Sequence, residues 1–205
     1  MAVTNNVKSF LTQIGQGVKP NMFVVDINFP AGAGETTDKD LFQLMCKSAA
    51  LPGSNLGVIE VPFRGRTVKI AGDRTFDTWS ATFFNDKNMQ LRAFFEEWAN
   101  ELNSHEANTA PRFLPNGQDN GYMADLFVTQ LEKDDKISGS AVRTYHLHHC
   151  FPTNVSQIDL AYDSNDQIEE FTVEWQYSFF TATKADSKTS AGAEVKGDAS
   201  PRPVV

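Results

Sequence analysis

Histidine is the residue type in this sequence best suited to chemistry, and three of the four histidines fall in one segment, His146-Leu147-His148-His149-Cys150. A His-x-His pair on a β-strand points both imidazoles to the same face, and such pairs recur in mononuclear metal sites. A third ligand would have to come from elsewhere, and His105 is the only other histidine. The alternative is a polar strand surface with Tyr145 and Leu147 turned to the core. We favour that alternative and assign no metal ligand and no cofactor.

Other catalytic arrangements have little support. Cys46 or Cys150 paired with a histidine would resemble a nucleophile and its base. However, Cys46 ends the apolar run Leu44-Met45-Cys46, where a buried, inert thiol is the usual finding. The sequence contains no phosphate-binding loop, no dinucleotide fingerprint, no serine nucleophile elbow and no zinc-protease motif. The sequence therefore predicts a protein that is not an enzyme.

Composition excludes several further classes of protein. The chain has 205 residues, a formal net charge of −8, 40% apolar residues and two cysteines, which predicts one soluble globular domain without a disulfide framework. No cluster of Lys and Arg provides the footprint that binds nucleic acid. The apolar runs are far shorter than the roughly 20 residues of a membrane helix, so we expect no membrane insertion.

Hydrophobic periodicity supplies the elements that would position these residues. A short amphipathic helix is expected to begin after Thr4 or Asn5 and to end before Gly15, and a longer one to cover 88–102. Strand patterns cover 22–29, 42–50, 58–63, 67–71, 79–84, 123–131, 141–150 and 169–180. The expected fold is mainly β (α+β), an antiparallel β-sandwich or barrel with one packed α-helix and a short N-terminal helix. Residues 1–181 form the expected single domain, and 182–205 an extended low-complexity C-terminal tail.

Three segments carry more specific information, namely 45–53 (Met-Cys-Lys-Ser-Ala-Ala-Leu-Pro-Gly), 70–79 (Ile-Ala-Gly-Asp-Arg-Thr-Phe-Asp-Thr-Trp) and 151–155 (Phe-Pro-Thr-Asn-Val). In this order they resemble the tail tube protein of contractile-tailed, T4-like bacteriophages, over roughly 18–180. The residues that match the family motifs are Gly72, Asp73, Arg74, Thr75, Phe76, Trp79, Pro152, Thr153 and Asn154.

The resemblance implies a tail-tube-like fold and a structural, virion protein assembled in the host cytoplasm. Hexameric rings of this chain would stack into a hollow tube inside a contractile sheath, and genomic DNA would pass through the lumen without specific binding. Its partners would be further copies of itself, the sheath protein, and the baseplate and tail-terminator proteins. The alternatives are a tube or ring protein of a type VI secretion system or bacteriocin, a baseplate tube initiator, and, more distantly, a His-rich metal-binding barrel enzyme.

The expected tube assembly suggests which residues face the lumen and which contact neighbouring subunits. The alternation in 141–150 places Thr144, His146 and His148 opposite the core, where they would face the lumen. The turn formed by Arg64, Gly65 and Arg66 would reach the next ring, or would simply be a solvated turn. Gly72 is expected to adopt a positive φ. Asp73, Arg74 and Asp77 are expected to form an ion-pair network that either locks a local turn or clamps a neighbouring subunit.

Overall fold

The computed structural model describes residues 7–15, 17–28, 39–110, 122–132 and 140–184. In order, the helices and strands of this part of the chain are α1 (Val7–Ile14), β1 (Phe23–Asn28), α2 (Lys39–Met45), β2 (Cys46–Ala49), β3 (Asn55–Phe63), β4 (Arg66–Thr75), β5 (Trp79–Phe84), α3 (Gln90–Leu102), β6 (Ala124–Glu132), β7 (Ser140–Val155), β8 (Glu170–Gln176) and β9 (Phe179–Lys184). None of these helices has the length and apolar character needed to cross a membrane.

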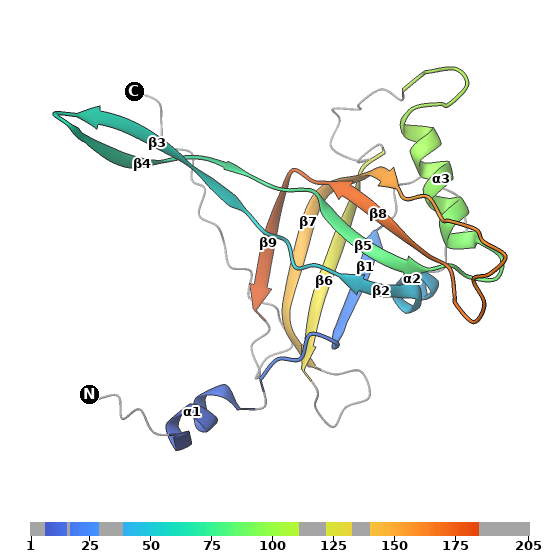
Figure 1. Cartoon of the computed structure of the whole chain (residues 1–205), viewed down its shortest axis with the longest axis horizontal. Coiled ribbons are helices and arrows are strands. Elements are labelled where there is room, and N and C mark those ends of the chain that lie inside the picture. The colour runs from blue at the N-terminus through green and yellow to red at the C-terminus, as the bar shows by residue number, and fades with distance from the viewer. Residues whose placement is uncertain (1–6, 16, 29–38, 111–121, 133–139, 185–205) are drawn as a thin grey trace.

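Seven strands form one bent antiparallel sheet in the order β1-β6-β7-β8-β5-β2, with β9 also paired to β7. The bend lies in β7, a strand of 16 residues. Its residues 143–148 pair with β9 and its residues 151–155 pair with β8. His149, between these two stretches, has a φ of 58°. Figure 1 shows β9, β7, β6 and β1 side by side in one half of the sheet, with β8, β5 and β2 crossing them in the other.

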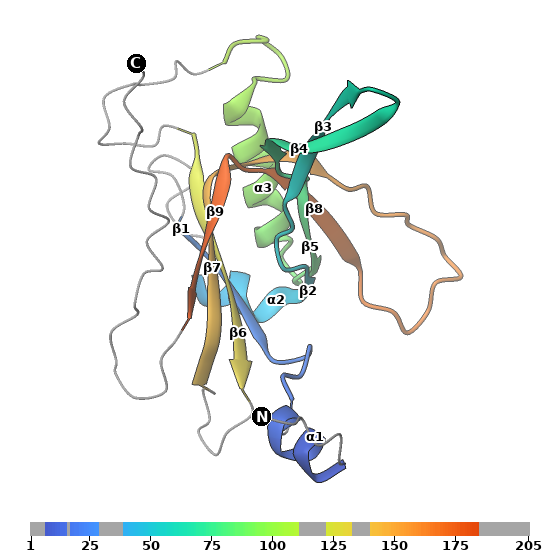
Figure 2. The ribbon, with the colours of Figure 1, turned by 90° about the vertical axis from the view of Figure 1, so that its left-hand side faces the viewer.

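The core fills the space inside this bend, and α3 lies between the two halves of the sheet (Figure 2). Aromatic rings dominate it: Phe95 of α3 lies 5.7 Å, centroid to centroid, from both Phe83 of β5 and Trp175 of β8. The burial of Phe171, Val173 and Trp175 alternates with half-buried neighbours, as the period-two pattern predicts. The predicted antiparallel, mainly β fold with one packed helix and a short N-terminal helix is confirmed.

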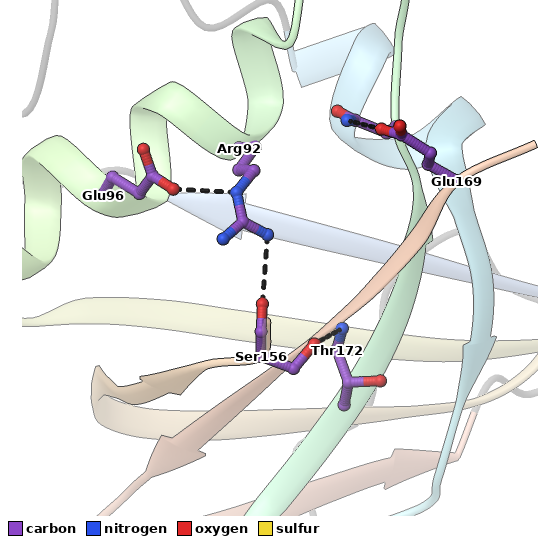
Figure 3. A network of polar contacts seen from close by, with 6 residues as sticks. Arg92, Glu96, Ser156, Glu169 and Thr172 are labelled. Atoms are coloured by element: carbon purple, nitrogen blue, oxygen red, sulfur yellow. Dashed lines mark hydrogen bonds and ion pairs between the residues drawn. The ribbon is translucent and has the colours of Figure 1, made fainter. Parts of the chain in front are cut away.

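Helix α3 is fixed by its apolar face and by one arginine. Leu91, Phe94, Phe95 and Trp98 are buried, which confirms the predicted stripe. Arg92 Nε lies 2.8 Å from Glu96 Oε1, and its Nη1 donates to the carbonyl of Ser156 at 3.0 Å (Figure 3). Ser156 Oγ in turn accepts from the backbone N–H of Thr172 in β8 at 2.8 Å. The network ties the helix to the sheet across a gap of 64 residues in the chain.

Two segments differ from the expected elements. The strand expected over 42–50 is a helix up to Met45 and a strand only from Cys46, because Leu41, Phe42 and Met45 share one helical face while Leu44 points to solvent. The strand expected over 169–180 is two strands, β8 and β9. Strand β9 continues through 182–184, the first residues of the expected tail, and the rest of that tail lies outside the described residues.

Candidate functional site

The β3–β4 hairpin projects far from the body (Figure 1). Its turn has two central residues, Arg64 and Gly65, with φ values of 46° and 81°. Positive φ at both positions is what a type I′ turn requires, and this turn matches the twist of paired strands. The predicted turn is therefore present, although the strands on either side, 55–63 and 66–75, are longer than the sequence patterns indicated.

The hairpin is amphipathic, and its apolar face is open to solvent. Cross-strand pairing places Ile59 beside Ile70 and Val61 beside Val68 on one face, whereas Glu60 and Lys69 form an ion pair of 3.4 Å on the other. The exposed fractions of the apolar side chains on the first face are 53% for Ile59, 42% for Val61, 62% for Phe63, 51% for Val68 and 52% for Ile70. Exposed apolar faces of this size are typical of contact surfaces, and a contact role for this hairpin stays a prediction.

Gly72 has a different role from the one we expected. Its φ is not positive; instead, it faces Gly57 across a bulge in the hairpin, where the pairing shifts between Leu56 and Val58. A Cβ on Gly72 would lie 3.2 Å from the carbonyl carbon and oxygen of Gly57 and 3.3 Å from Ile59 Cγ1. The two glycines therefore let the strands approach closely at the point where the hairpin leaves the body.

We expect Gly72→Ala to loosen the base of the hairpin, because the added methyl would displace backbone atoms of β3. A cost of about 1–3 kcal/mol is typical of such overpacking. Amide hydrogen exchange in β3 and β4 should accelerate, while exchange in α3 stays unchanged. Gly53→Ala is the matched control, since nothing lies within 4 Å of its Cβ position. Equal exchange rates in the two variants would contradict this role for Gly72.

The aromatic residues of the same motif anchor the hairpin to the core. Phe76 packs against Tyr177 and Phe180 with centroid distances of 5.6 and 5.7 Å. Trp79 lies 5.0 Å from Trp175, and its Nε1 donates to the carbonyl of Ala50 at 2.6 Å. These contacts fix the direction in which the hairpin projects.

The expected network of Asp73, Arg74 and Asp77 is not formed within the described residues. Arg74 Nη1 instead approaches Ser54 Oγ at 3.5 Å, and Asp77 Oδ2 accepts from Asn55 Nδ2 at 2.6 Å. Asp73, Arg74 and Asp77 are all exposed. The structure therefore does not support an ion-pair network that stabilises the local turn. A role of these residues in contacts between subunits stays a prediction.

The Pro-Thr-Asn motif lies where β7 meets β8. Pro152 is buried and opposite Trp175, and Thr153 Oγ1 donates to the carbonyl of Glu174 at 3.2 Å. The register shifts between Pro152 and Asn154. Because proline lacks an N–H, a position beside an irregularity in the ladder suits it. The motif thus shapes the second half of the sheet.

Thr144, His146 and His148 share the sheet face opposite the core, while Leu147 between them is fully buried. They form the middle of a polar face across β1, β6, β7 and β9. The register gives three rows on this face, Val24–Thr129–Thr144–Thr183, Asp26–Phe127–His146–Thr181 and Asn28–Asp125–His148–Phe179. In the last row the bulge at 148–149 shifts the pairing with Asp125 by one residue. None of these twelve positions is Lys or Arg.

Asp125 is the residue of this face that the sequence did not single out. Its Oδ1 accepts from the backbone N–H of His149 at 3.1 Å, and its Oδ2 lies 3.1 Å from His146 Nε2. A carboxylate about twenty residues before a histidine segment gives no signal in one sequence, because the contact depends on the pairing of β6 with β7. Only the register brings the acid to the imidazoles.

The two thiols have the inert character expected of buried cysteines. Cys150 is buried and Cys46 is half-buried. Burial raises the pKa of both thiols to about 12, so both are protonated at neutral pH. Neither thiol is therefore activated as a nucleophile.

Two solved chains with this fold come from contractile injection machines. A chain of the sheath–tube complex of an extracellular contractile injection system in its extended state superposes with a TM-score of 0.57 at 14% identity, covering 85% of this chain and 97% of that chain. A chain of the tube-terminating cap of the anti-feeding prophage superposes with a TM-score of 0.56 at 15% identity, covering 82% and 91%. The chain therefore shares its fold with proteins of such machines.

Sequence comparison identifies the family to which the chain belongs. The family described as phage tail tube protein matches residues 18–183. The tail tube protein gp19 of Enterobacteria phage T4 is 31% identical over 159 residues, covering 78% of this chain and 88% of gp19. The tail tube protein of Serratia phage KSP90 is 26% identical over 177 residues, covering 86% and 95%. The chain belongs to the phage tail tube protein family, and its function is that of a structural tube subunit of a contractile tail, as the sequence motifs predicted.

Proposed function

We propose that six copies of this chain close into a ring through the four-stranded half of the sheet, and that the rings stack into a hollow tube. The observation that carries this proposal is the pair of open edges. Among the described residues, β1 pairs only with β6, and β9 pairs only with β7. An open edge is a template for another strand, and closure into a barrel removes it.

The strand directions favour head-to-tail closure. All neighbours in the series β1-β6-β7-β9 are antiparallel. Because the series has an even number of strands, β9 of one copy and β1 of the next run in opposite directions when the copies are related by rotation about the ring axis. The joint therefore continues the same antiparallel pattern, and a heterologous contact that closes produces a ring.

The face of Thr144, His146 and His148 then lines the lumen. Its hydroxyl, amide and carboxylate groups, with Asp26 and Asp125 and no Lys or Arg in the three rows, offer little attraction to DNA phosphates. Genomic DNA would pass along this wall without specific binding. The exposed apolar face of the hairpin would pack against the adjacent ring, and the turn at Arg64–Arg66 would also contact that ring.

The remaining features of the proposal come from the family and the related assemblies. The tube would lie inside a sheath protein, begin at baseplate proteins and end at a tail terminator, with assembly in the host cytoplasm and a place in the virion. The chain would act as a building block and not as a catalyst. The expected single tube domain, residues 1–181, would extend to the end of β9 at residue 184, with the rest as a C-terminal extension.

Electron microscopy of the purified full chain tests the assembly. At rising protein concentration in a kosmotropic salt, and with purified baseplates as nuclei, we expect hollow tubes whose end views have six-fold symmetry. Rings of another symmetry would overturn the hexamer. Chains that remain monomeric even on baseplates would overturn the tube.

The lumen assignment predicts a charge-specific effect at Thr144. Tubes of Thr144→Lys should retain several-fold more double-stranded DNA at low salt than unmodified tubes, because each added lysine attracts phosphate, and the excess should vanish at high salt. Thr144→Glu is the matched control, since it adds a side chain of similar reach with the opposite charge. Equal DNA retention by the two variants in a sedimentation assay would place Thr144 outside the lumen.

A further inference from the structure

The strongest unassigned feature is a cluster of three side chains on β6 and β7. A carboxylate oxygen of Asp125 and one ring nitrogen each of His146 and His148 lie within 4.8 Å of one another. All three side chains are half-buried on the polar face of the sheet. Two imidazoles and one carboxylate form a ligand set that zinc and other divalent first-row transition metals accept.

The distance between the first two ligand atoms already suits a shared ion. His146 Nε2 and Asp125 Oδ2 are 3.1 Å apart. Two ligand atoms bound to one ion at about 2.1 Å, at tetrahedral or octahedral angles, are separated by about 3.0–3.4 Å. The ligand atom of His148 lies within 4.8 Å of the other two. His148 Nε2 is also 3.2 Å from Thr181 Oγ1, so coordination through this nitrogen would replace that contact.

The His146 nitrogen makes no hydrogen bond of good geometry within the described part of the chain. Nε2 is buried and has no aligned hydrogen-bond partner among the described residues, despite the nearby carboxylate. A buried nitrogen without a partner is costly, and a metal ion would satisfy it. An ion would also take up the negative charge that Asp125 brings to this face.

The cluster is held in place by its neighbours. Phe127 stacks on His146 with a centroid distance of 4.2 Å and an interplanar angle of 19°, and Phe179 stacks on His148 at 4.4 Å and 20°. The other oxygen of Asp125 is held by the backbone N–H of His149. Such supporting contacts hold ligands in a fixed orientation before the ion binds.

We propose that Asp125, His146 and His148 bind one divalent transition-metal ion per chain, for which Zn²⁺ is the natural candidate. The site is complete within a single chain, so it goes beyond the proposed tube and does not depend on ring formation. In the chain, a bound ion would brace β6 against β7 at the bulge where β7 bends.

Cobalt titration of the full chain tests the site, with protein purified without a histidine tag and stripped by a chelator. We expect one Co²⁺ per chain with visible absorption bands of a nitrogen- and oxygen-ligated ion, displaced by Zn²⁺. His148→Asn, at a half-exposed position, should weaken binding at least tenfold, and Asp125→Asn should do the same. His105→Asn is the matched control, because His105 is an exposed histidine outside the cluster.

Thermal unfolding supplies a second measurement that does not depend on spectra. Zn²⁺ should raise the melting temperature of the unmodified chain and of His105→Asn, because an ion bound only to the native state stabilises it. At the same Zn²⁺ concentration the rise should be clearly smaller for His148→Asn, because its site binds the ion more weakly. Circular dichroism of the metal-free variants checks that each is folded. Absence of Co²⁺ binding, or binding that His148→Asn and His105→Asn weaken equally, would overturn the proposal.

Discussion

Val68→Asp in the hairpin is expected to abolish tube assembly while the chain itself stays folded. Val68 pairs with Val61 on the apolar face of β3–β4 and is 51% exposed in the single chain. A charge at this position costs the isolated subunit little, because the side chain is already in contact with water. The loss of strand propensity costs about 1 kcal/mol, which is small beside the stability of a folded domain.

The cost arises on assembly. If the apolar face is covered by the adjacent ring, as we propose, the aspartate must lose its water without gaining a partner. A penalty of about 3 kcal/mol per contact would raise the protein concentration needed for assembly by roughly 100-fold, since each 1.4 kcal/mol is a factor of ten. Every subunit of a ring would carry the same defect, so tubes should be absent at concentrations where the unmodified chain forms them.

Thr67→Asp is the matched control for this experiment. Thr67 is the adjacent residue of β4, pairs with Pro62 and lies on the opposite face of the hairpin. It is also β-branched, so the two substitutions change strand propensity to a similar extent. Sedimentation and electron microscopy should find tubes with Thr67→Asp and none with Val68→Asp. Equal assembly of both variants would contradict a covered apolar face.

Sequence patterns best predicted the helices and strands that bury one regular face against the core. The strand over 79–84 and the helix ending at Leu102 were placed correctly, because one stripe or one alternation is buried against a single core. The sequence patterns failed where one strand ends and the next begins with a different pairing partner. The alternation from Phe171 to Phe179 runs unbroken through Ser178, where the backbone N–H instead bonds to His148 and the chain passes from β8 to β9.

The candidate sites show the same division. Alternation alone placed Thr144, His146 and His148 on one face, because strand geometry fixes the direction of side chains. It could not supply Asp125, which a register between distant segments brings to the histidines. Nor could it assign Gly72, whose constraint is the backbone of Gly57 across the hairpin and not its own φ.

Trp98 in α3 carries the largest expected effect on stability. Its side chain is fully buried, and its Nε1 donates to the carbonyl of Tyr122 at 2.9 Å. Trp98→Ala removes a large ring and leaves a cavity between the two halves of the sheet, and such changes cost about 3–5 kcal/mol. Denaturant unfolding followed by circular dichroism should register this loss. The neighbouring exposed change Glu97→Ala should stay within about 0.5 kcal/mol of the unmodified chain.

A comparison of two Trp→Phe variants separates packing from hydrogen bonding. Trp175 is also fully buried, but its Nε1 has no hydrogen-bond partner among the described residues. Phenylalanine at Trp98 removes a donor from the Tyr122 carbonyl, whereas phenylalanine at Trp175 removes an unsatisfied donor whose burial was already unfavourable. The two variants lose similar volume, so Trp98→Phe should be the more destabilising by about 1–2 kcal/mol. A larger loss of unfolding free energy for Trp175→Phe would contradict this expectation. It would mean that the ring packing of Trp175 contributes more than the hydrogen bond of Trp98.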